Sequence, residues 1–112
     1  MNPAATHEPG GYAMIMTSAS SREEARSLAR GLVEARLAAC VQLAPIESVY
    51  AWRGTVEQAD EVLLMVKTSA ARVDEVQAWL LARHSYETPE VVCAPLTSGS
   101  PAYLRWIDEV TG

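Results

Sequence analysis

The stretch that decides the fold runs from Ile46 to Thr68 and reads IESVYAWRGTVEQADEVLLMVKT. Its Arg53-Gly54 pair favours a tight turn, because glycine supplies the positive φ that a short hairpin loop needs. The β-branched and aromatic residues before the turn suit a pleated surface, and no proline or glycine interrupts residues 55–68. The stretch therefore predicts a β-hairpin with a long second arm.

The length of that arm has a consequence for assembly. Fully extended, residues 55–68 would span roughly 45 Å, whereas a compact domain of this size is about 35 Å across. The arm must therefore bend, or its tip must project. A projecting tip that carries Tyr50, Trp52 and Val56 is an apolar edge that needs a cover, and a second copy of the chain is the simplest one.

Composition and charge restrict the class of protein. The 112 residues are 49% hydrophobic and 21% charged, which is ordinary for one soluble globular domain. A net charge of −5 argues against a general nucleic-acid or anionic-membrane binder, whose affinity depends on Lys and Arg. No apolar run is long enough to span a membrane.

The beginning of the chain predicts a tail rather than a folded element. Residues 1–11 are rich in Pro, Gly and Ala and lack the basic and apolar regions of a secretion signal. We expect a disordered tail over 1–11 and a single domain over 12–112. Two cysteines without such a signal favour reduced thiols in the cytoplasm.

Periodicity elsewhere predicts two more strands, the beginning of the hairpin's first strand and three helices. Ser20 with Glu23, or Ser21 with Glu24, fits the Ser-x-x-Glu capping box before a helix that ends near residue 36, in which glycine at 31 indicates close packing. Ser69 is expected to cap the second helix, and Ser100-Pro101 the third. The expected strands cover residues 12–16, 38–44 and 91–96, and the expected helices begin near residues 21, 69 and 100.

The resulting order is the α+β ferredoxin-like βαββαβ sandwich with a long hairpin and a short C-terminal helix, and with strand order 4-1-3-2. Pro45 should interrupt the second strand's ladder, so we expect that strand at a sheet edge with a kink. Two helices cover only one face of an antiparallel sheet. Yet residues 14–16, 62–66 and 91–94 are apolar on both faces, which favours a subunit interface on the second face.

Several separated motifs in one order make the chain resemble the CutA divalent-cation tolerance family over about residues 13–107. The matching segments are Ala38-Ala39-Cys40-Val41, Ser48-Val49-Tyr50-Ala51-Trp52-Arg53-Gly54, Glu61-Val62, Lys67-Thr68, His84-Ser85-Tyr86-Glu87-Thr88-Pro89-Glu90 and Tyr103-Leu104-Arg105-Trp106. The resemblance implies a homotrimer with an architecture similar to the PII signalling proteins. It also implies a role in the response to metal ions, with copper as a bound divalent metal.

The metal ligands are less clear than the fold. In some bacterial members a Cys at the end of the first strand joins a His before the Tyr-x-x-Pro-Glu motif, but here the first strand ends Met16-Thr17-Ser18. His84, with Glu87 or Glu90, is the remaining candidate set, and so few soft ligands predict weak binding. The alternative for His84 is a helix cap or a cation favoured by the helix dipole.

The two cysteines are expected on opposite sheet edges. Cys40 and Cys93 would then be too far apart to share a disulfide or a metal within one chain. Their simplest role is that of small buried hydrophobic residues.

A third group of candidates lies on or beside the apolar strands: Tyr50, Trp52, Glu61, Lys67 and Tyr86. Lys67 shares a face with Leu63 and Met65, and a charge there needs a partner. Either it forms a structural salt bridge with Glu61 or Glu90, or the group lines a small-ligand cleft between subunits. Packing at a subunit interface alone would also explain the two aromatic residues before the turn.

No catalytic motif is present: the chain has no nucleophile triad, phosphate loop or nucleotide-binding glycine pattern. The missing motifs argue against an enzyme, the absence of a secretion signal favours the cytoplasm, and the resemblance implies a trimeric divalent-metal-binding protein. The alternative is a PII-like signalling or scaffold trimer that binds a small ligand between its subunits.

Overall fold

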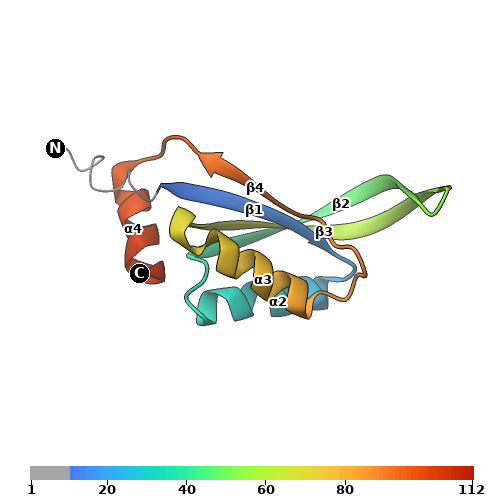
Figure 1. The fold of residues 1–112 in the computed structure, drawn as a ribbon, viewed down its shortest axis with the longest axis horizontal. Coiled ribbons are helices and arrows are strands. Elements are labelled where there is room, and N and C mark those ends of the chain that lie inside the picture. The colour runs from blue at the N-terminus through green and yellow to red at the C-terminus, as the bar shows by residue number, and fades with distance from the viewer. Residues whose placement is uncertain (1–10) are drawn as a thin grey trace.

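The computed structural model describes residues 11–112, so the tail expected over 1–11 lies, apart from Gly11, outside the described residues. The elements follow the predicted order (Figure 1). They are β1 (Tyr12–Ala19), α2 (Arg22–Glu34), β2 (Cys40–Trp52), β3 (Thr55–Ser69), the 3-10 turn η1 (Ala70–Arg72), α3 (Val73–Arg83), β4 (Val91–Leu96) and α4 (Pro101–Thr111).

The four strands form one antiparallel sheet in the order β2-β3-β1-β4. This is the predicted order, read from the other edge. Helices α2 and α3 lie side by side on one face of the sheet, and α4 lies at the end of the sheet opposite the hairpin tip (Figure 1). The ferredoxin-like fold class is confirmed.

The hairpin projects from the body, which is one of the two outcomes that its length left open. The molecule measures 53 × 24 × 22 Å, and the turn between β2 and β3 lies at one extreme of the long axis (Figure 1). Arg53 and Gly54 have φ angles of 51° and 81°, the two positive values of a two-residue type I′ turn. The positive φ of glycine was expected, whereas that of arginine was not.

The prediction for Pro45 is only partly correct. Strand β2 is an edge strand, but it runs unbroken through Pro45, which is in register with Val62. An edge strand forms ladder hydrogen bonds on one side only, so a residue without an N–H can be accommodated without ending the strand.

The main core lies between the sheet and the two helices. Ile15, Leu64 and Val66 from the strands and Leu32 and Leu80 from the helices are completely buried. Gly31 of α2 packs against Trp79 of α3, where an added Cβ would lie 2.7 Å from the indole ring. The close packing expected at this glycine is confirmed.

The other face of the sheet, called here the open face, is covered by α4 only at one end. There Tyr12, Ala39 and Ile107 form a small second cluster. Farther along, apolar side chains from the adjacent strands remain half-buried; they are Met14, Met16, Ala44, Ile46, Leu63 and Met65. The sheet is therefore apolar on both faces, as the sequence predicted.

Only one of the three predicted serine caps forms a side-chain capping bond. Ser21 caps α2 and its hydroxyl accepts from the Glu24 N–H at 3.0 Å. Ser100 and Pro101 stand at the predicted positions of α4, although the serine side chain makes no capping bond. Ser69 instead precedes η1 and also makes no side-chain capping bond, so its predicted capping role is wrong.

Candidate functional site

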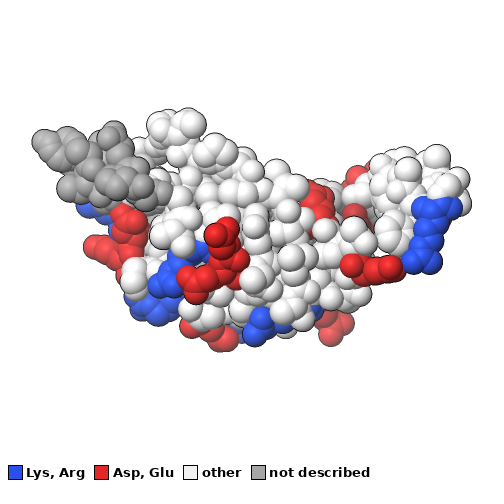
Figure 2. Space-filling model, in the orientation of Figure 1, with Lys and Arg blue, Asp and Glu red and all other residues white. Residues whose placement is uncertain are grey.

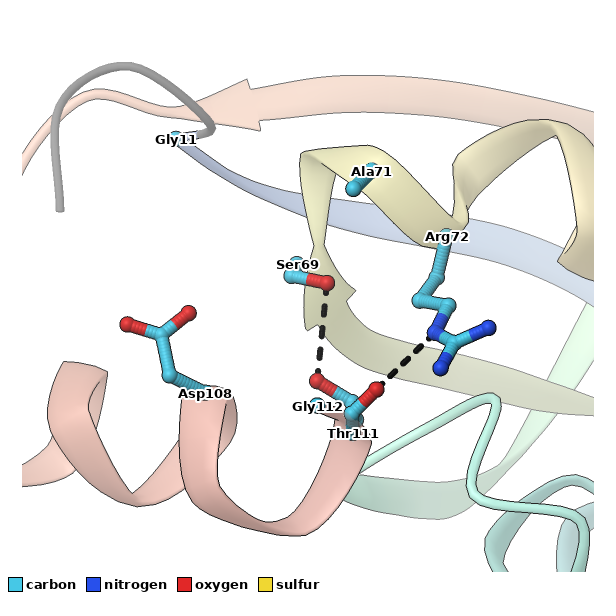
Figure 3. Close-up of a pocket in the computed structure, with 7 residues that line it drawn as sticks. All are labelled: Gly11, Ser69, Ala71, Arg72, Asp108, Thr111 and Gly112. Atoms are coloured by element: carbon cyan, nitrogen blue, oxygen red, sulfur yellow. Dashed lines mark hydrogen bonds between the residues drawn. The ribbon is translucent and has the colours of Figure 1, made fainter.

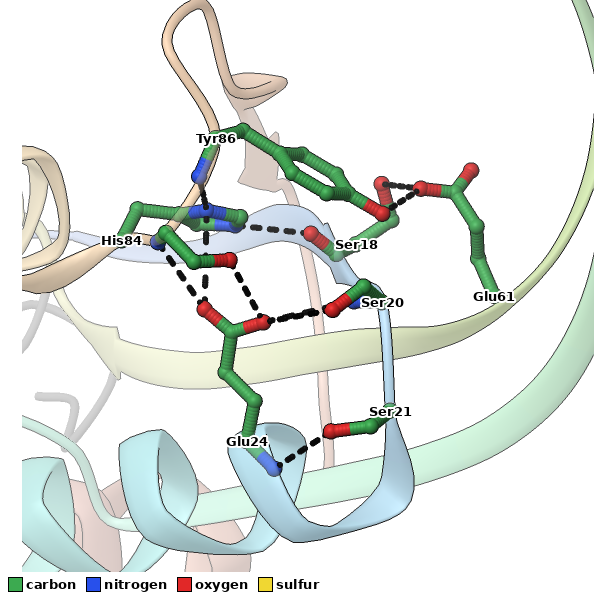
Figure 4. A network of polar contacts seen from close by, with 8 residues as sticks. Ser18, Ser20, Ser21, Glu24, Glu61, His84 and Tyr86 are labelled. Carbon is green, nitrogen blue, oxygen red and sulfur yellow. Dashed lines mark hydrogen bonds and ion pairs between the residues drawn. The ribbon is translucent and has the colours of Figure 1, made fainter.

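The site begins where β1 ends and α2 starts, because the capping interactions there hold a carboxylate in place. Glu24 Oε1 accepts hydrogen bonds from the backbone N–H and the hydroxyl of Ser20, at 3.3 and 3.2 Å. On the other side, the Ser85 N–H donates to Glu24 Oε2 at 3.0 Å and the Ser85 hydroxyl to Glu24 Oε1 at 2.9 Å. One carboxylate thus joins the first turn of α2 to the loop after α3 (Figure 4).

His84 caps the C-terminus of α3 and its side chain is completely buried. Nε2 lies 2.7 Å from the Ser18 carbonyl oxygen, and Nδ1 accepts from the Tyr86 N–H at 3.1 Å. A carbonyl only accepts and a backbone N–H only donates, so the neutral ring with its proton on Nε2 satisfies both partners. His84 thus stands at the C-cap position that one alternative predicted, where its backbone N–H donates to the Leu80 carbonyl oxygen at 2.9 Å, whereas its ring bonds β1 and the following loop.

Glu61 of β3 forms the second half of the network. The Tyr86 hydroxyl donates to Glu61 Oε2 at 2.6 Å and the Ser18 hydroxyl at 3.3 Å, and Ser48 donates as well. Figure 4 shows the Tyr86 and Ser18 hydroxyls next to each other, both directed at the same oxygen of this carboxylate. The network therefore connects the loop after α3 to the base of the hairpin.

Hydrogen bonding keeps both carboxylates ionised. Burial alone would raise the pKa of Glu24, but the hydrogen bonds from Ser85 and Ser20 outweigh it and lower that pKa. Burial likewise opposes ionisation of Glu61, and the donors Ser48, Tyr86 and Ser18 lower its pKa. Burial and the adjacent Glu61 raise the pKa of Tyr86, so that hydroxyl remains a donor.

The predicted metal ligands are not brought together in one chain. Glu87 forms an ion pair with Arg53 at 2.9 Å, and both side chains are 69% exposed. The two ring nitrogens of His84 already have hydrogen-bonding partners. Within residues 11–112, no three His, Cys, Asp or Glu side chains are close enough to hold one metal ion. The donors of the described residues therefore do not fit a closed metal site, and Figure 2 shows acidic and basic side chains next to each other at the hairpin end of the molecule.

The predicted cleft residues divide into two groups along the open face. Glu61 and Tyr86 are hydrogen-bonded to each other, and Tyr50 and Trp52 lie farther out on the hairpin, 45% and 38% exposed. Lys67 lies toward the other end of β3, where its Nζ donates to Gln42 Oε1 at 2.7 Å. The predicted salt bridge of this lysine to Glu61 or Glu90 does not form among residues 11–112. Glu61 lies six residues along the same strand, which separates the two groups by about 20 Å.

Cys40 and Cys93 lie on opposite edge strands and are free thiols, as expected. They are not buried: Cys40 is partly exposed and Cys93 is exposed. An edge strand has a neighbour on one side only, which explains why these positions are more open than their apolar surroundings suggested.

A separate pocket lies at the α4 end of the molecule. It has a volume of about 320 Å³ and lies between Ser69, Arg72, Asp108 and the end of the chain (Figure 3). Arg72 Nε donates to the Thr111 carbonyl oxygen at 2.9 Å. The pocket borders Gly11, where the described part of the chain begins, and sequence reasoning did not identify it.

Sequence reasoning also missed three partners in the site. The Glu24–Ser85 contact joins residues 61 positions apart, and no local pattern predicts such a contact. The other two could have been predicted. Ser48 and Gln42 are each two residues from the position opposite Glu61 and Lys67, respectively. Side chains two residues apart on a strand point to the same face.

Comparison with known proteins identifies the family. Residues 13–110 match the family of the CutA1 divalent ion tolerance protein. The Divalent-cation tolerance protein CutA of Thermus thermophilus is 40% identical over 100 residues, which cover 88% of this chain and 97% of that protein. Protein CutA of Mus musculus is 39% identical over 104 residues, and this chain spans 59% of its length.

A solved structure agrees with the fold. The periplasmic divalent cation tolerance protein CutA of Archaeoglobus fulgidus superposes with a TM-score of 0.89 at 40% identity, over 90% of this chain and 99% of that one. The sheet order, the projecting hairpin and the sequence match together lead to one conclusion. This chain belongs to the CutA1 divalent ion tolerance family.

Proposed function

We propose that the protein acts as a homotrimer in the response to divalent metal ions, copper among them, and that it binds its ligand without transforming it. The observation that carries the proposal is the open face. Met14, Met16, Leu63 and Met65 lie half-buried there, and no helix or strand within residues 11–112 lies across them. A contiguous apolar surface of this kind indicates a subunit contact.

The hairpin supports the same assembly. At its tip Val49 and Val56 are 68% and 76% exposed, and Tyr50 and Trp52 point to the opposite side of the strand. A tip that is apolar on both sides suits insertion between neighbouring subunits. The resemblance to trimeric relatives sets the number of subunits in the proposal at three.

Metal binding in this proposal occurs between subunits. His84, Glu87 and Glu90 lie on one short segment, and a neighbouring chain would supply the missing donors. His84 would have to release a hydrogen bond and Glu87 its contact with Arg53. Both costs predict weak binding of copper or another divalent ion. The free thiols suit a reducing cytoplasm, which cell fractionation would test.

The experiment has two parts. Light scattering on a sizing column should give three times 12.1 kDa, and a stable monomer would overturn the assembly. Calorimetry should then show Cu(II) binding that His84→Ala abolishes and Glu87→Gln weakens. Glu34→Gln is the matched control, because it breaks an equally exposed ion pair, with Arg30, elsewhere on the molecule. Equal Cu(II) binding by all variants would exclude the segment 84–90 as the metal site.

One observation favours the second candidate, a PII-like trimer that binds a small ligand in its inter-subunit clefts. Lys67 carries a charge on the open face and has only a neutral partner there. Glu61, Tyr86, Tyr50 and Trp52 lie toward the hairpin end of the same face, so a cleft with both charged and aromatic walls would combine Lys67 of one subunit with these residues of a neighbour.

A further inference from the structure

Lys67 is the only lysine in the chain, since the other eight basic residues are arginines. It lies on the open face of β3, in register with Cys40 on one side and Met14 on the other. The side chain is half-buried in a surface that is otherwise apolar. An ammonium group in that position needs compensation once the surface is covered.

The compensation within the chain is incomplete. Nζ donates one hydrogen bond, to Gln42 Oε1 at 2.7 Å, and an ammonium has three donors. Among residues 11–112 no Asp or Glu forms an ion pair with it. The two carboxylates on the same face of its own strand, Glu57 and Glu61, lie ten and six residues away, about 20 Å or more along the strand, and Glu61 already accepts from Tyr86 and Ser18.

The contact with Gln42 also orients the amide. An ammonium only donates, so the amide oxygen must face Lys67 and the amide nitrogen is directed away from it. The two side chains therefore place an N⁺–H donor and a neutral N–H₂ donor next to each other on the open face. Two adjacent donors of this kind match the two oxygens of one carboxylate.

We propose that Lys67 and Gln42 form a receiving site for a carboxylate or a similar oxyanion at the subunit contact. The inference rests on the proposed assembly, because burial by a neighbouring subunit is what makes an uncompensated ammonium costly. Two sources supply the same chemistry: an Asp or Glu side chain of a second copy, or a free anion enclosed between the subunits.

The first test compares Lys67→Met with Lys67→Arg in the full chain. Methionine keeps the length of the side chain but removes the charge, whereas arginine keeps both a charge and donors. With an anion in place, the methionine variant should dissociate at a concentration at least about tenfold higher than the wild type, because it leaves a buried anion unpaired. The arginine variant should stay within about threefold of the wild type.

The sign of the methionine result decides the question. Without an anion, removing a buried unpaired charge strengthens the assembly. A Lys67→Met protein that assembles as tightly as the wild type, or more tightly, would therefore exclude a carboxylate of a second copy. It would overturn the whole proposal if acetate also fails to protect Lys67 in the second test.

The second test uses the wild type and does not depend on a variant that folds. Because Lys67 is the only lysine, an amine-acylating reagent can modify only it and the amino terminus, and mass spectrometry separates the two. Sodium acetate, compared with sodium chloride at the same ionic strength, should slow acylation of Lys67 if the anion is free in solution. Acylation that is slow in both salts, together with weakened assembly of Lys67→Met, would assign the anion to a second copy.

Rapid acylation in both salts, with assembly unchanged in the methionine variant, would exclude an anion from either source. A wild type that is monomeric by light scattering would overturn the proposed trimer itself. In that case the acetate comparison alone decides the anion site, so the two failures can be told apart.

Discussion

Thr17 gives the sharpest prediction about stability. Its side chain is completely buried in β1, and its hydroxyl has no hydrogen-bonding partner among the described residues. Thr68, on the neighbouring strand β3, is equally buried, but its hydroxyl donates to the Leu37 carbonyl oxygen at 2.7 Å. The same Thr→Val substitution should therefore have opposite effects at these two positions.

The magnitudes follow from what each hydroxyl does. Valine at position 17 keeps the shape of the side chain and removes a buried hydroxyl that forms no hydrogen bond among the described residues. This should stabilise the fold by ~1–2 kcal/mol. Valine at position 68 removes a hydrogen bond and leaves the Leu37 carbonyl unsatisfied, which should destabilise the fold by ~1–3 kcal/mol. On a domain of this size these changes correspond to shifts of roughly 4–8 °C per kcal/mol, in opposite directions.

The assay is thermal or urea unfolding of the wild type and both variants at one protein concentration, since assembly and folding are linked. Equal urea m-values would show that the variants expose the same surface on unfolding. If Thr17→Val lowers the stability, as Thr68→Val is expected to do, the buried hydroxyl has an unrecognised partner and the reasoning is refuted.

Other predictions concern packing, acid and assembly. Gly31→Ala should lower the free energy of unfolding by up to ~2 kcal/mol, because its new Cβ meets the Trp79 ring. That overpacking costs ~1–3 kcal/mol, and the gain of about 1 kcal/mol in helix propensity offsets only part of it. A more stable variant in urea would contradict this packing. Glu24 and Glu61 have lowered pKa values in the folded state. Their contribution to the free energy of unfolding is therefore fully present above the unfolded pKa near 4.5 and is lost as the pH falls through the folded pKa values. Melting temperatures from pH 7 to pH 3 should show this loss, and a double Glu→Gln variant should flatten the curve; an unchanged curve would exclude these two groups. Trp52→Ala should lower the stability of the assembly by ~3–5 kcal/mol if a neighbouring subunit covers the ring. The loss should appear as a lower, concentration-dependent melting temperature. An unchanged melting temperature would place Trp52 on a free surface.

The amino-acid sequence by itself determined most of the architecture. Periodicity and turn residues predicted the order of the strands and helices, and the apolar character of residues 14–16 and 62–66 on both faces predicted an open face that needs a cover. Ser21 with Glu24 marked the start of α2 because capping is a local interaction between neighbouring residues. The length of residues 55–68 predicted an arm that must bend or project, since strand length depends only on the number of residues, and the fold shows that it projects.

The tertiary structure decided which polar groups meet. Glu24 contacts Ser85, and Lys67 contacts Gln42 rather than Glu61, because register and loop geometry, not separation along the chain, bring such groups within 3 Å. His84 was identified from the sequence as a ligand or a cap, and only the positions of Ser18 and the Tyr86 N–H show that both of its nitrogens are used. Periodicity identifies the face on which a side chain lies, but a hydrogen bond depends on distances of a few tenths of an ångström, which are set only when the whole fold is packed.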